Sequence, residues 1–315
     1  MNIYKMNIHN MGAFLLRKNR AIRSNLFAVQ KVFPLLSLAR LGTVAFFAIC
    51  VAITGCSPKT GGEAAALVPA QAAQAADAGL RDTAMAILWQ QQSGEYAALC
   101  YQAFNAGRAF VREAQAAEAG GRYAAVLDID ETVLDNSPYA AYLVHQNAPW
   151  SAESWEAWCN AAAAEAVPGA LDFCRFLAEN GIEIFYVSNR PDSTLSATTA
   201  NLQALGFPNA RADHVLLQTG TSDKTPRVNS VREQGYTVLL FAGDNLDDFD
   251  GSIRKHTNAA RKDWAETNAA TFGLHRIVLP NAAYGTFEAA LVDGYYGKPP
   301  AERAAARLEL LKSWK

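Results

Sequence analysis

Short apolar runs alternate with amphipathic stretches along the second half of the chain. The apolar runs predict five buried strands, at Tyr123–Ile129, Ile182–Ser188, His214–Gln218, Val238–Ala242 and Arg276–Leu279. The stretches between them predict helices over Pro168–Asn180, Asp192–Leu205 and Arg227–Gln234, with a further helix from about Thr286. Strands separated by helices of this length predict an α/β fold, a Rossmann-like parallel sheet with helices on both faces.

Upstream of these strands, apolar residues recur at helical spacing from about Leu80 to Ala119. Ser93 and Gly94 interrupt the pattern, so we expect two helices there.

Nearer the N-terminus, the apolar stretch Leu41–Gly55 is shorter than the roughly 20 residues that cross a bilayer as a helix. Residues 1–55 contain Lys and Arg but no Asp or Glu. A basic segment followed by a short apolar one is typical of a secretory signal peptide.

The sequence Ile53-Thr54-Gly55-Cys56 is similar to a bacterial lipobox, in which the signal is cleaved before a cysteine that then carries lipids. We therefore expect a signal peptide over residues 1–55, a flexible tether over 56–79 and a folded domain over 80–315. An ordinary signal peptide with an incidental cysteine is the alternative. A lipidated Cys56 would anchor the protein in the bacterial cell envelope, and Ser57 favours the outer membrane by analogy with known sorting.

Composition and charge narrow the class of protein. Half of the residues are hydrophobic, which excludes disordered and low-complexity chains. Beyond residue 55, 21 basic residues stand against 30 acidic ones, so we expect no polymeric nucleic acid as a partner. The spacing of the cysteines Cys100, Cys159 and Cys174 matches no regular disulfide pattern, although one bridge among them stays an alternative. The sequence also leaves open whether the protein forms a homodimer.

Polar and charged residues follow the ends of four predicted strands. They are Asp128 and Asp130 after the first, Ser188, Asn189 and Arg190 after the second, Lys224 after the third, and Asp244 and Asp248 after the fourth. Because ligands bind outside the carboxyl ends of parallel strands, we expect these side chains to form one site.

The first acidic pair is the most informative. Asp128 and Asp130 are expected to face one crevice while Ile129 points into the fold. Two carboxylates this close oppose joint ionisation, which favours a nucleophile beside a general acid. An EF-hand calcium loop requires Gly at its sixth position, where the chain has Val133. A solvated acidic turn stays an alternative for either acidic segment taken alone.

Four convergent carboxylates would repel one another without a cation among them. An all-oxygen set with open positions suits Mg²⁺, which keeps several waters and binds substrate phosphate. Lys224 adds a positive charge, and Ser188 and Asn189 offer donors for phosphate oxygens. The parts that phosphoryl transfer requires are therefore expected at this site. The candidate metal ligands are Asp128, Asp130, Asp244 and Asp248.

Two motifs carry a resemblance to a known family. VLDIDETVLDNSPY, from Val126, and VLLFAGDNLDDF, from Val238, resemble the paired signature of the class C acid phosphatases. These are bacterial lipoproteins of the haloacid dehalogenase (HAD) superfamily, and the resemblance extends from about Leu80 to the C-terminus. It implies the HAD fold with a small, mainly helical cap, expected at about 80–120 and 137–166.

The resemblance also implies a role for each polar residue. Asp128 would be the nucleophile that forms an aspartyl-phosphate, and Asp130 the general acid, whose backbone carbonyl also binds Mg²⁺. The remaining roles implied are phosphoryl binding by Ser188 and Lys224, Mg²⁺ ligation by Asp244 and support of the metal site by Asp248.

The resemblance implies phosphomonoesters as substrates, often nucleoside 5′-monophosphates, hydrolysed outside the cytoplasm. Trp150 and Tyr284 are the first candidates to stack a nucleobase, and packing within the cap is the alternative role. Two competing functions are a phosphotransferase on the same scaffold and a surface-binding lipoprotein.

Overall fold

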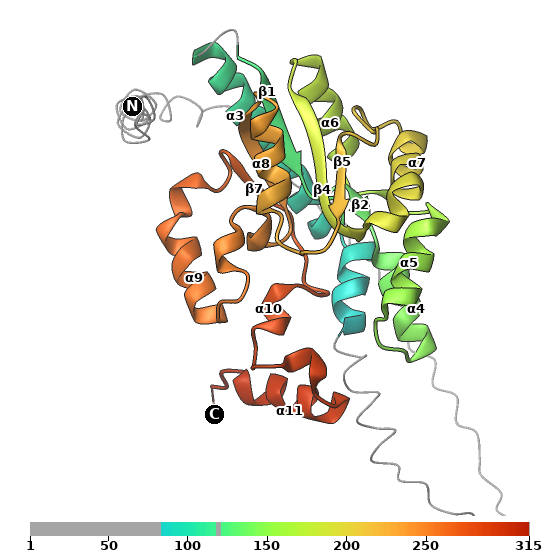
Figure 1. Ribbon diagram of the computed structural model, residues 1–315. Helices are drawn as coiled ribbons and strands as arrows, with labels where there is room; N and C mark the ends of the chain where they lie inside the picture. Colours follow the sequence, from blue (N-terminus) through green and yellow to red (C-terminus); the bar gives the residue numbers. More distant parts are fainter. Residues whose placement is uncertain (1–82, 118–120, 315) are drawn as a thin grey trace, which may run out of the picture. The chain divides into compact units, whose positions relative to one another are not determined.

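A five-stranded parallel sheet forms the centre of the fold (Figure 1), and its order is β5-β4-β1-β6-β7. The computed structural model of the chain describes residues 83–117 and 121–314. The strands are β1 (Tyr123–Leu127), β4 (Glu183–Pro191), β5 (Val215–Gln218), β6 (Thr237–Gly243) and β7 (Arg276–Val278). All neighbouring pairs run parallel, so the five predicted strands and the α/β fold are confirmed.

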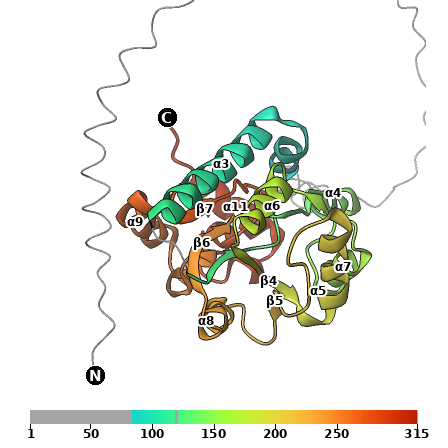
Figure 2. The same cartoon turned by 90° about the horizontal axis from the view of Figure 1, so that it is seen from above.

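Helices cover both faces of the sheet, as expected (Figure 2). On one face lie α3 (Gly94–Ala117) and α6 (Ala170–Glu179), and on the other lies α8 (Thr225–Glu233). The side chains of β1 alternate between two cores because successive residues of a strand point to opposite faces. Leu127 belongs to the core beneath α3 and α6, whereas Val126 packs against the α8 residues.

The N-terminal helices match the expected pair. Residues 83–92 form one helix, and the chain leaves helical conformation at Ser93 before α3 begins. The Ser93 hydroxyl accepts a hydrogen bond from the Tyr96 backbone N–H at 3.1 Å, which caps the first turn of α3. A Cβ on Gly107 would lie 2.9 Å from the Phe173 ring, so glycine allows α3 to approach α6 closely.

The remaining elements surround the carboxyl edge of the sheet. The short strands β2 (Leu134–Asp135) and β3 (Glu165–Ala166) pair antiparallel. Between them lie α4 (Ser137–Gln146) and α5 (Ala152–Ala161), and α7 (Leu195–Leu205) packs against α5. After β6 come η2 (Leu246–Asp248), η3 (Gly251–Ile253), α9 (Asn258–Thr267) and η4 (Ala269–Thr271). The helix expected from Thr286 is short, and the last elements are α10 (Thr286–Ala289), η5 (Tyr295–Gly297) and α11 (Pro300–Leu310).

Several expectations concern segments that the structure does not test. Cys56, the signal peptide and the tether lie outside the described residues. The division into a main domain and a helical cap stays a prediction. Within residues 83–117 and 121–314, none of the helices has the length and apolar character of a membrane span.

The three cysteines of the described domain are buried and have free thiols, so the structure contains no disulfide among Cys100, Cys159 and Cys174.

Candidate active site

The register of the three central strands brings the predicted site residues to one edge. Leu127 of β1 lies opposite Tyr186 of β4 and Ala242 of β6. The backbone N–H of Asp128 continues the ladder, donating to the Ala242 carbonyl at 2.9 Å. Asp128, Ser188 within β4 and Asp244 just after β6 therefore meet at the carboxyl edge of the sheet.

Lys224 joins two of the carboxylates. Its Nζ donates hydrogen bonds to Oδ1 of Asp128 and, at 2.7 Å, to Oδ1 of Asp248. Only 9% of the Lys224 side chain is exposed. Burial lowers the pKa of Lys224, but the charges of Asp128 and Asp248 outweigh it and leave this pKa above its ordinary value. Lys224 therefore stays charged in the site and cannot be a loop lysine in open solvent.

Two local features fix the position of Asp248. The carboxylate accepts a hydrogen bond from the Asn245 backbone N–H at 3.0 Å, and the Asn245 side chain caps η2 in return. The other feature is Gly243, where a Cβ would lie only 2.3 Å from Oδ2 of Asp248. Glycine at the end of β6 is thus required for Asp248 to approach the strand.

Asp128, Asp244 and Asp248 form a carboxylate cluster. Each offers an oxygen, and these oxygens lie within 4.8 Å of one another. Burial raises the pKa of Asp128 well above its ordinary range, although the Lys224 charge opposes the shift. Burial and the charge of Asp248 raise the pKa of Asp244 to about 7. The side chains of Asp128 and Asp248 are buried and Asp244 is half-buried, and one lysine does not balance the charge of three ionised carboxylates. Their oxygens suit a hard divalent cation.

Asp130 is held apart from this cluster. Its Oδ1 accepts hydrogen bonds from Arg190 Nε at 2.8 Å and from Asn136 Nδ2 at 2.9 Å. Its Oδ2 accepts the Ser188 hydroxyl at 2.8 Å, and the same hydroxyl oxygen accepts the Arg190 backbone N–H. The carboxylates of Asp128 and Asp130 therefore have different partners, although only one residue separates them.

Arg190 ties Asp130 to the neighbouring helices. It is 1% exposed, and its Nη2 donates to Asn136 Oδ1 at 3.1 Å. The indole N–H of Trp158 donates to the same oxygen at 2.8 Å, and the guanidinium lies 5.7 Å from the Trp155 ring centroid. Asp130, Arg190, Asn136 and Trp158 thus form one polar network that joins β4 to α5.

Glu131 occupies the strained position after Asp130. Its φ is +56°, a left-handed conformation that is uncommon outside glycine. Its carboxylate accepts the Asn136 backbone N–H at 2.9 Å and also the Tyr284 hydroxyl. Burial, with the charges of Asp130 and Asp244, raises the Glu131 pKa well above its usual range. Tyr284 thereby links a distant loop to the first acidic motif.

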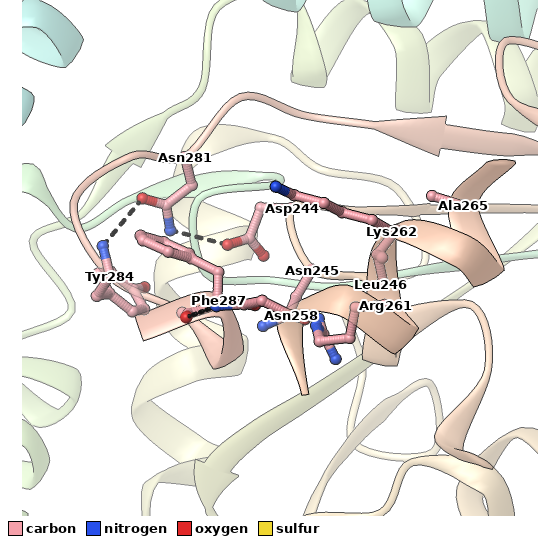
Figure 3. A pocket seen from close by; sticks show the side chains of 11 residues that line it. Asp244, Asn245, Leu246, Asn258, Arg261, Lys262, Ala265, Asn281, Tyr284 and Phe287 are labelled. Carbon is pink, nitrogen blue, oxygen red and sulfur yellow. Dashed lines mark hydrogen bonds between the residues drawn. The ribbon is translucent and has the colours of Figure 1, made fainter. Parts of the chain in front are cut away.

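A cavity of about 240 Å³ opens beside Asp244 (Figure 3). Asn281 donates to Oδ2 of Asp244 at 2.8 Å and forms one wall. Tyr284, 39% exposed, and Phe287 contribute aromatic lining, and Lys262 reaches in from α9. The cavity offers apolar and polar contacts next to the carboxylate cluster.

The structure brings together most, but not all, of the predicted residues. Asp128, Lys224, Asp244 and Asp248 form the centre, with Asp130 and Ser188 beside it. The Asn189 side chain instead donates to the Ser222 carbonyl at 3.0 Å and accepts a hydrogen bond from Arg227. Trp150 is 59% exposed before α5 and does not line the cavity.

Three further residues hold the carboxylates of the site, and the sequence places one of them, Arg190, at this edge without giving it a role. Arg190, Asn136 and Asn281 each hold a carboxylate of the site. The signal for Arg190 is its place in the polar segment Ser188-Asn189-Arg190 after an apolar run. Asn136 lies within the first quoted motif, but its partners, like those of Asn281, are set by the tertiary fold.

Comparisons with known proteins indicate the family and the fold of the chain. Residues 56–287 match the family model described as HAD superfamily, subfamily IIIB (acid phosphatase). The fold is similar to the class C acid phosphatase of Bacillus anthracis, at 38% identity and a TM-score of 0.71, over 76% of this chain and 100% of that one. A structure of that enzyme with tungstate bound matches with the same values.

More distant relatives match a shorter region. Acid phosphatase 1 of Solanum lycopersicum is 26% identical over 140 residues, which are 42% of this chain and 54% of the relative. A stem 31 kDa glycoprotein of Glycine max is 27% identical over 134 residues, 41% of this chain and 53% of the relative. The matched region thus spans about half the length of these relatives.

Proposed function

Because the chain belongs to the acid phosphatases of subfamily IIIB in the HAD superfamily, we propose that it hydrolyses phosphomonoesters with the help of Mg²⁺. The observation that carries the proposal is the double contact of Lys224 with Asp128 and Asp248, beside Asp244. A buried lysine among three carboxylates is a costly arrangement for a protein that only binds surfaces. It is the arrangement required for carboxylate attack on a phosphate dianion.

In the first step, an oxygen of Asp128 attacks phosphorus and the bond to the ester oxygen breaks. In the substrate complex Asp130 carries a proton on Oδ2. The departing alkoxide takes this proton, so the alcohol leaves neutral and an aspartyl-phosphate remains. In the second step, water gives its proton to Asp130 and attacks phosphorus, which releases phosphate and the Asp128 carboxylate. Lys224 reduces the repulsion between the carboxylate and the phosphoryl oxygens in both steps.

Ser188 connects substrate binding to the availability of Asp130. Its hydroxyl donates to Oδ2 of Asp130, while Arg190 and Asn136 occupy Oδ1. In the proposed mechanism the arriving phosphoryl oxygen takes the Ser188 donor. Oδ2 is then free to exchange a proton with the leaving group, while Oδ1 keeps the carboxyl in place.

A divalent ion fits the carboxylate cluster, and Mg²⁺ is the proposed one. Asp128, Asp244 and Asp248 would hold it, together with the backbone carbonyl of Asp130, the donor set that the chemistry of Mg²⁺ favours. When bound, the ion supplies positive charge against the phosphoryl oxygens and the ionised carboxylates.

Nucleoside 5′-monophosphates are the proposed substrates. Tyr284 and Phe287 line the cavity next to Asp244, and aromatic rings at this place can stack a base whose phosphate lies at Asp128. Trp150 lies outside the cavity lining and is the weaker candidate.

The proposed setting is the outer membrane, with lipids on Cys56 and the enzyme outside the cytoplasm. The basic, then apolar N-terminus and the lipobox-like sequence support this setting. Incorporation of labelled palmitate into the wild type but not into Cys56→Ala would support it. Labelling of the variant, or its retention in the membrane fraction, would refute it.

The direct test of the activity is release of phosphate from p-nitrophenyl phosphate. The full chain should release it, EDTA should stop the release and Mg²⁺ should restore it. Asp128→Asn should be inactive under all these conditions, which excludes a contaminating phosphatase. An inactive wild type with Mg²⁺ present would leave the chain as a binding protein on a phosphatase scaffold.

A further inference from the structure

The ladder between β4 and β5 is interrupted where the site residues of β4 lie. The residues of β4 that pair with β5 pass from Val187 directly to Pro191, with an irregular register between them. Ser188 and Asn189 lie in this gap. Such irregularities are frequent next to active sites, where they redirect side chains out of the regular ladder. Strand pairing therefore does not fix the distance between Ser188 and the segment that follows β5.

Arg227 of α8 bridges this gap. Its Nη1 donates a hydrogen bond to the Ser188 carbonyl, and its Nη2 donates to Oδ1 of Asn189 at 2.6 Å. Nη2 also donates to the Asp223 carbonyl at 3.3 Å. The half-buried guanidinium thus serves two oxygens of β4 and one of the segment after β5. A planar fork of donors is suited to hold several acceptors in one fixed geometry.

Asn189 forms a second contact across the same gap. Its Nδ2 donates to the Ser222 carbonyl at 3.0 Å, so both ends of its side-chain amide are engaged. The sequence predicts a phosphate contact for Asn189, whereas in the structure this amide joins β4 to the segment after β5. We call Asn189 and Arg227 together the β4–α8 clamp.

The β4–α8 clamp connects the two residues that are proposed to hold the phosphoryl group. Ser188 provides both the carbonyl that Arg227 binds and the proposed hydroxyl donor. Asp223, whose carbonyl Arg227 also binds, directly precedes Lys224. Lys224 is the N-cap residue of α8, and its carbonyl accepts the Val228 backbone N–H at 3.0 Å. Arg227 therefore lies in the same first helical turn as Lys224, and a shift of the clamp moves Ser188 relative to Lys224.

Other contacts hold α8 and the segment before it without the clamp. Val228 and Val231 of α8 pack in the core with Phe185 of β4. On the opposite side, Arg254 donates to the Ser222 hydroxyl. We therefore expect loss of the clamp to change the geometry at the carboxyl edge of the sheet while the fold stays intact.

We propose that Arg227 is a positioning residue that, with Asn189, sets the distance between Ser188 and Lys224 and thereby the affinity of the site for a phosphoryl group. The proposal rests on the proposed function, which gives Ser188 and Lys224 their contacts with phosphate. Hydrogen bonds weaken steeply when the donor leaves its preferred distance and angle, so a small shift of either residue lowers the affinity. The clamp acts on the phosphoryl group, whereas Arg190 acts on the acid Asp130.

The test is the inhibition constant (Ki) of inorganic phosphate, measured by competition with p-nitrophenyl phosphate on the full chain with Mg²⁺. Arg227→Gln should raise this Ki at least about tenfold, as expected for the loss of a charge-assisted hydrogen bond. Arg227→Lys should not restore the affinity, because an ammonium group keeps the charge but not the fork of donors. The control is Arg232→Gln, which changes an exposed arginine of the same helix and should leave the Ki unchanged.

Asn189→Ala completes a double-mutant cycle with Arg227→Gln. If the two residues act through one clamp, the double variant should have the same Ki as the more weakly binding single variant. Effects that multiply would overturn the proposal, because each residue would then act on phosphate separately.

A wild-type Ki in Arg227→Gln would also overturn the proposal, even with a lower Tm, since Arg227 would then only stabilise the fold. So would full recovery in Arg227→Lys, which would show that charge alone is sufficient. If Arg227→Gln does not fold, a wild-type Ki in both Arg227→Lys and Asn189→Ala overturns the proposal, and a raised Ki in both supports it. A wild type that neither hydrolyses p-nitrophenyl phosphate nor binds phosphate would refute the proposed function and this inference with it. An active wild type with unaffected clamp variants would overturn this inference alone.

Discussion

The Nε atom of Arg190 lies 2.8 Å from Oδ1 of Asp130, in a pair that places a guanidinium with 1% exposure against an acid of the first motif. Asn136 donates to the same oxygen, so Oδ1 is fully engaged. Oδ2 accepts only the Ser188 hydroxyl among the hydrogen bonds of the described residues. In the proposed mechanism, the pair therefore leaves Oδ2 as the oxygen of Asp130 that takes part in proton transfer.

Arg190→Gln should misplace Asp130 while keeping Asp128 and Lys224 intact. A displacement of about 1 Å can cost about 10²-fold in rate, and we expect such a loss in kcat/KM for a nucleotide. The loss should be smaller for p-nitrophenyl phosphate, whose leaving group needs no proton. Arg211→Gln, which breaks an exposed ion pair with Glu183, is the control and should leave both rates unchanged. Parallel losses on the two substrates would show that Arg190 only stabilises the fold.

Gly243→Ala should disturb the metal site through Asp248. A Cβ at this position would lie 2.3 Å from Oδ2 of Asp248, and the carboxylate must move away. We expect weaker Mg²⁺ binding by titration calorimetry, with partial recovery of activity at high Mg²⁺. The control is Gly94→Ala, where nothing lies within 4 Å of the new Cβ. Unchanged Mg²⁺ affinity in Gly243→Ala would exclude Asp248 from the metal site.

Mg²⁺ binding should depend on pH through Asp244. The pKa of Asp244 is raised to about 7, so its proton must leave before the carboxylate can bind the ion. Below this pH the affinity should fall about tenfold per pH unit, and binding should release protons. Calorimetry in two buffers with different ionisation enthalpies measures both effects. Equal affinity at pH 5.5 and 7.5 would contradict the assignment.

The same raised pKa affects stability. Between the unfolded value of about 4 and the folded value of about 7, the metal-free folded state binds a proton that the unfolded chain lacks. The stability of the metal-free protein should therefore fall as pH rises through this window. The rise in Tm caused by Mg²⁺ should accordingly be larger at pH 7.5 than at pH 5.5, and Asp244→Asn should reduce this difference to the part contributed by Asp128, whose pKa is also raised.

The ring of Tyr284 should stack on the base of a nucleotide, whereas its hydroxyl donates a hydrogen bond to Glu131. Tyr284→Phe keeps the ring, so the KM for a nucleoside 5′-monophosphate should change little. Tyr284→Ala removes the ring, and base stacking of about 1–3 kcal/mol predicts a KM about 5- to 150-fold higher. The KM for p-nitrophenyl phosphate serves as the control and should move less. A nucleotide KM that is unchanged in Tyr284→Ala would place the base elsewhere.

The sequence predicted the strands and the acidic residues well, because both depend on local patterns. Apolar runs specify buried strands, and Asp128 and Asp244 directly follow two of them. The apolar run predicts that β4 ends at Ser188, whereas the strand continues to Pro191. Hydrophobicity assigns a residue such as Arg190 to the surface, and only the pairing with Asp130 accounts for its burial.

Long-range contacts could not be predicted from local patterns. The hydrogen bond from Tyr284 to Glu131 joins residues 153 positions apart, and neither position carries a periodic signal. The inward arginines of α11 are a similar case. Their partners, Tyr295 and Glu288, are known only from the fold. Sequence patterns alone would place these arginines in solvent, whereas the structure exposes Glu302 and Glu309 of the same helix and half-buries the arginines.

The division of labour between Asp128 and Asp130 is the central claim. Asp128→Asn removes the attacking oxygen, so activity should be lost on every substrate. Asp130→Asn keeps the nucleophile but cannot protonate the leaving group, a contribution of about 10²–10⁴-fold for a poor leaving group. p-Nitrophenolate leaves readily without a proton.

The decisive measurement is therefore kcat/KM of both variants on a nucleoside 5′-monophosphate and on p-nitrophenyl phosphate. With Asp128 as nucleophile and Asp130 as general acid, Asp130→Asn should lose far more activity on the nucleotide, while Asp128→Asn should lose both activities alike. Equal losses on the two substrates in Asp130→Asn would contradict the assignment of nucleophile and general acid.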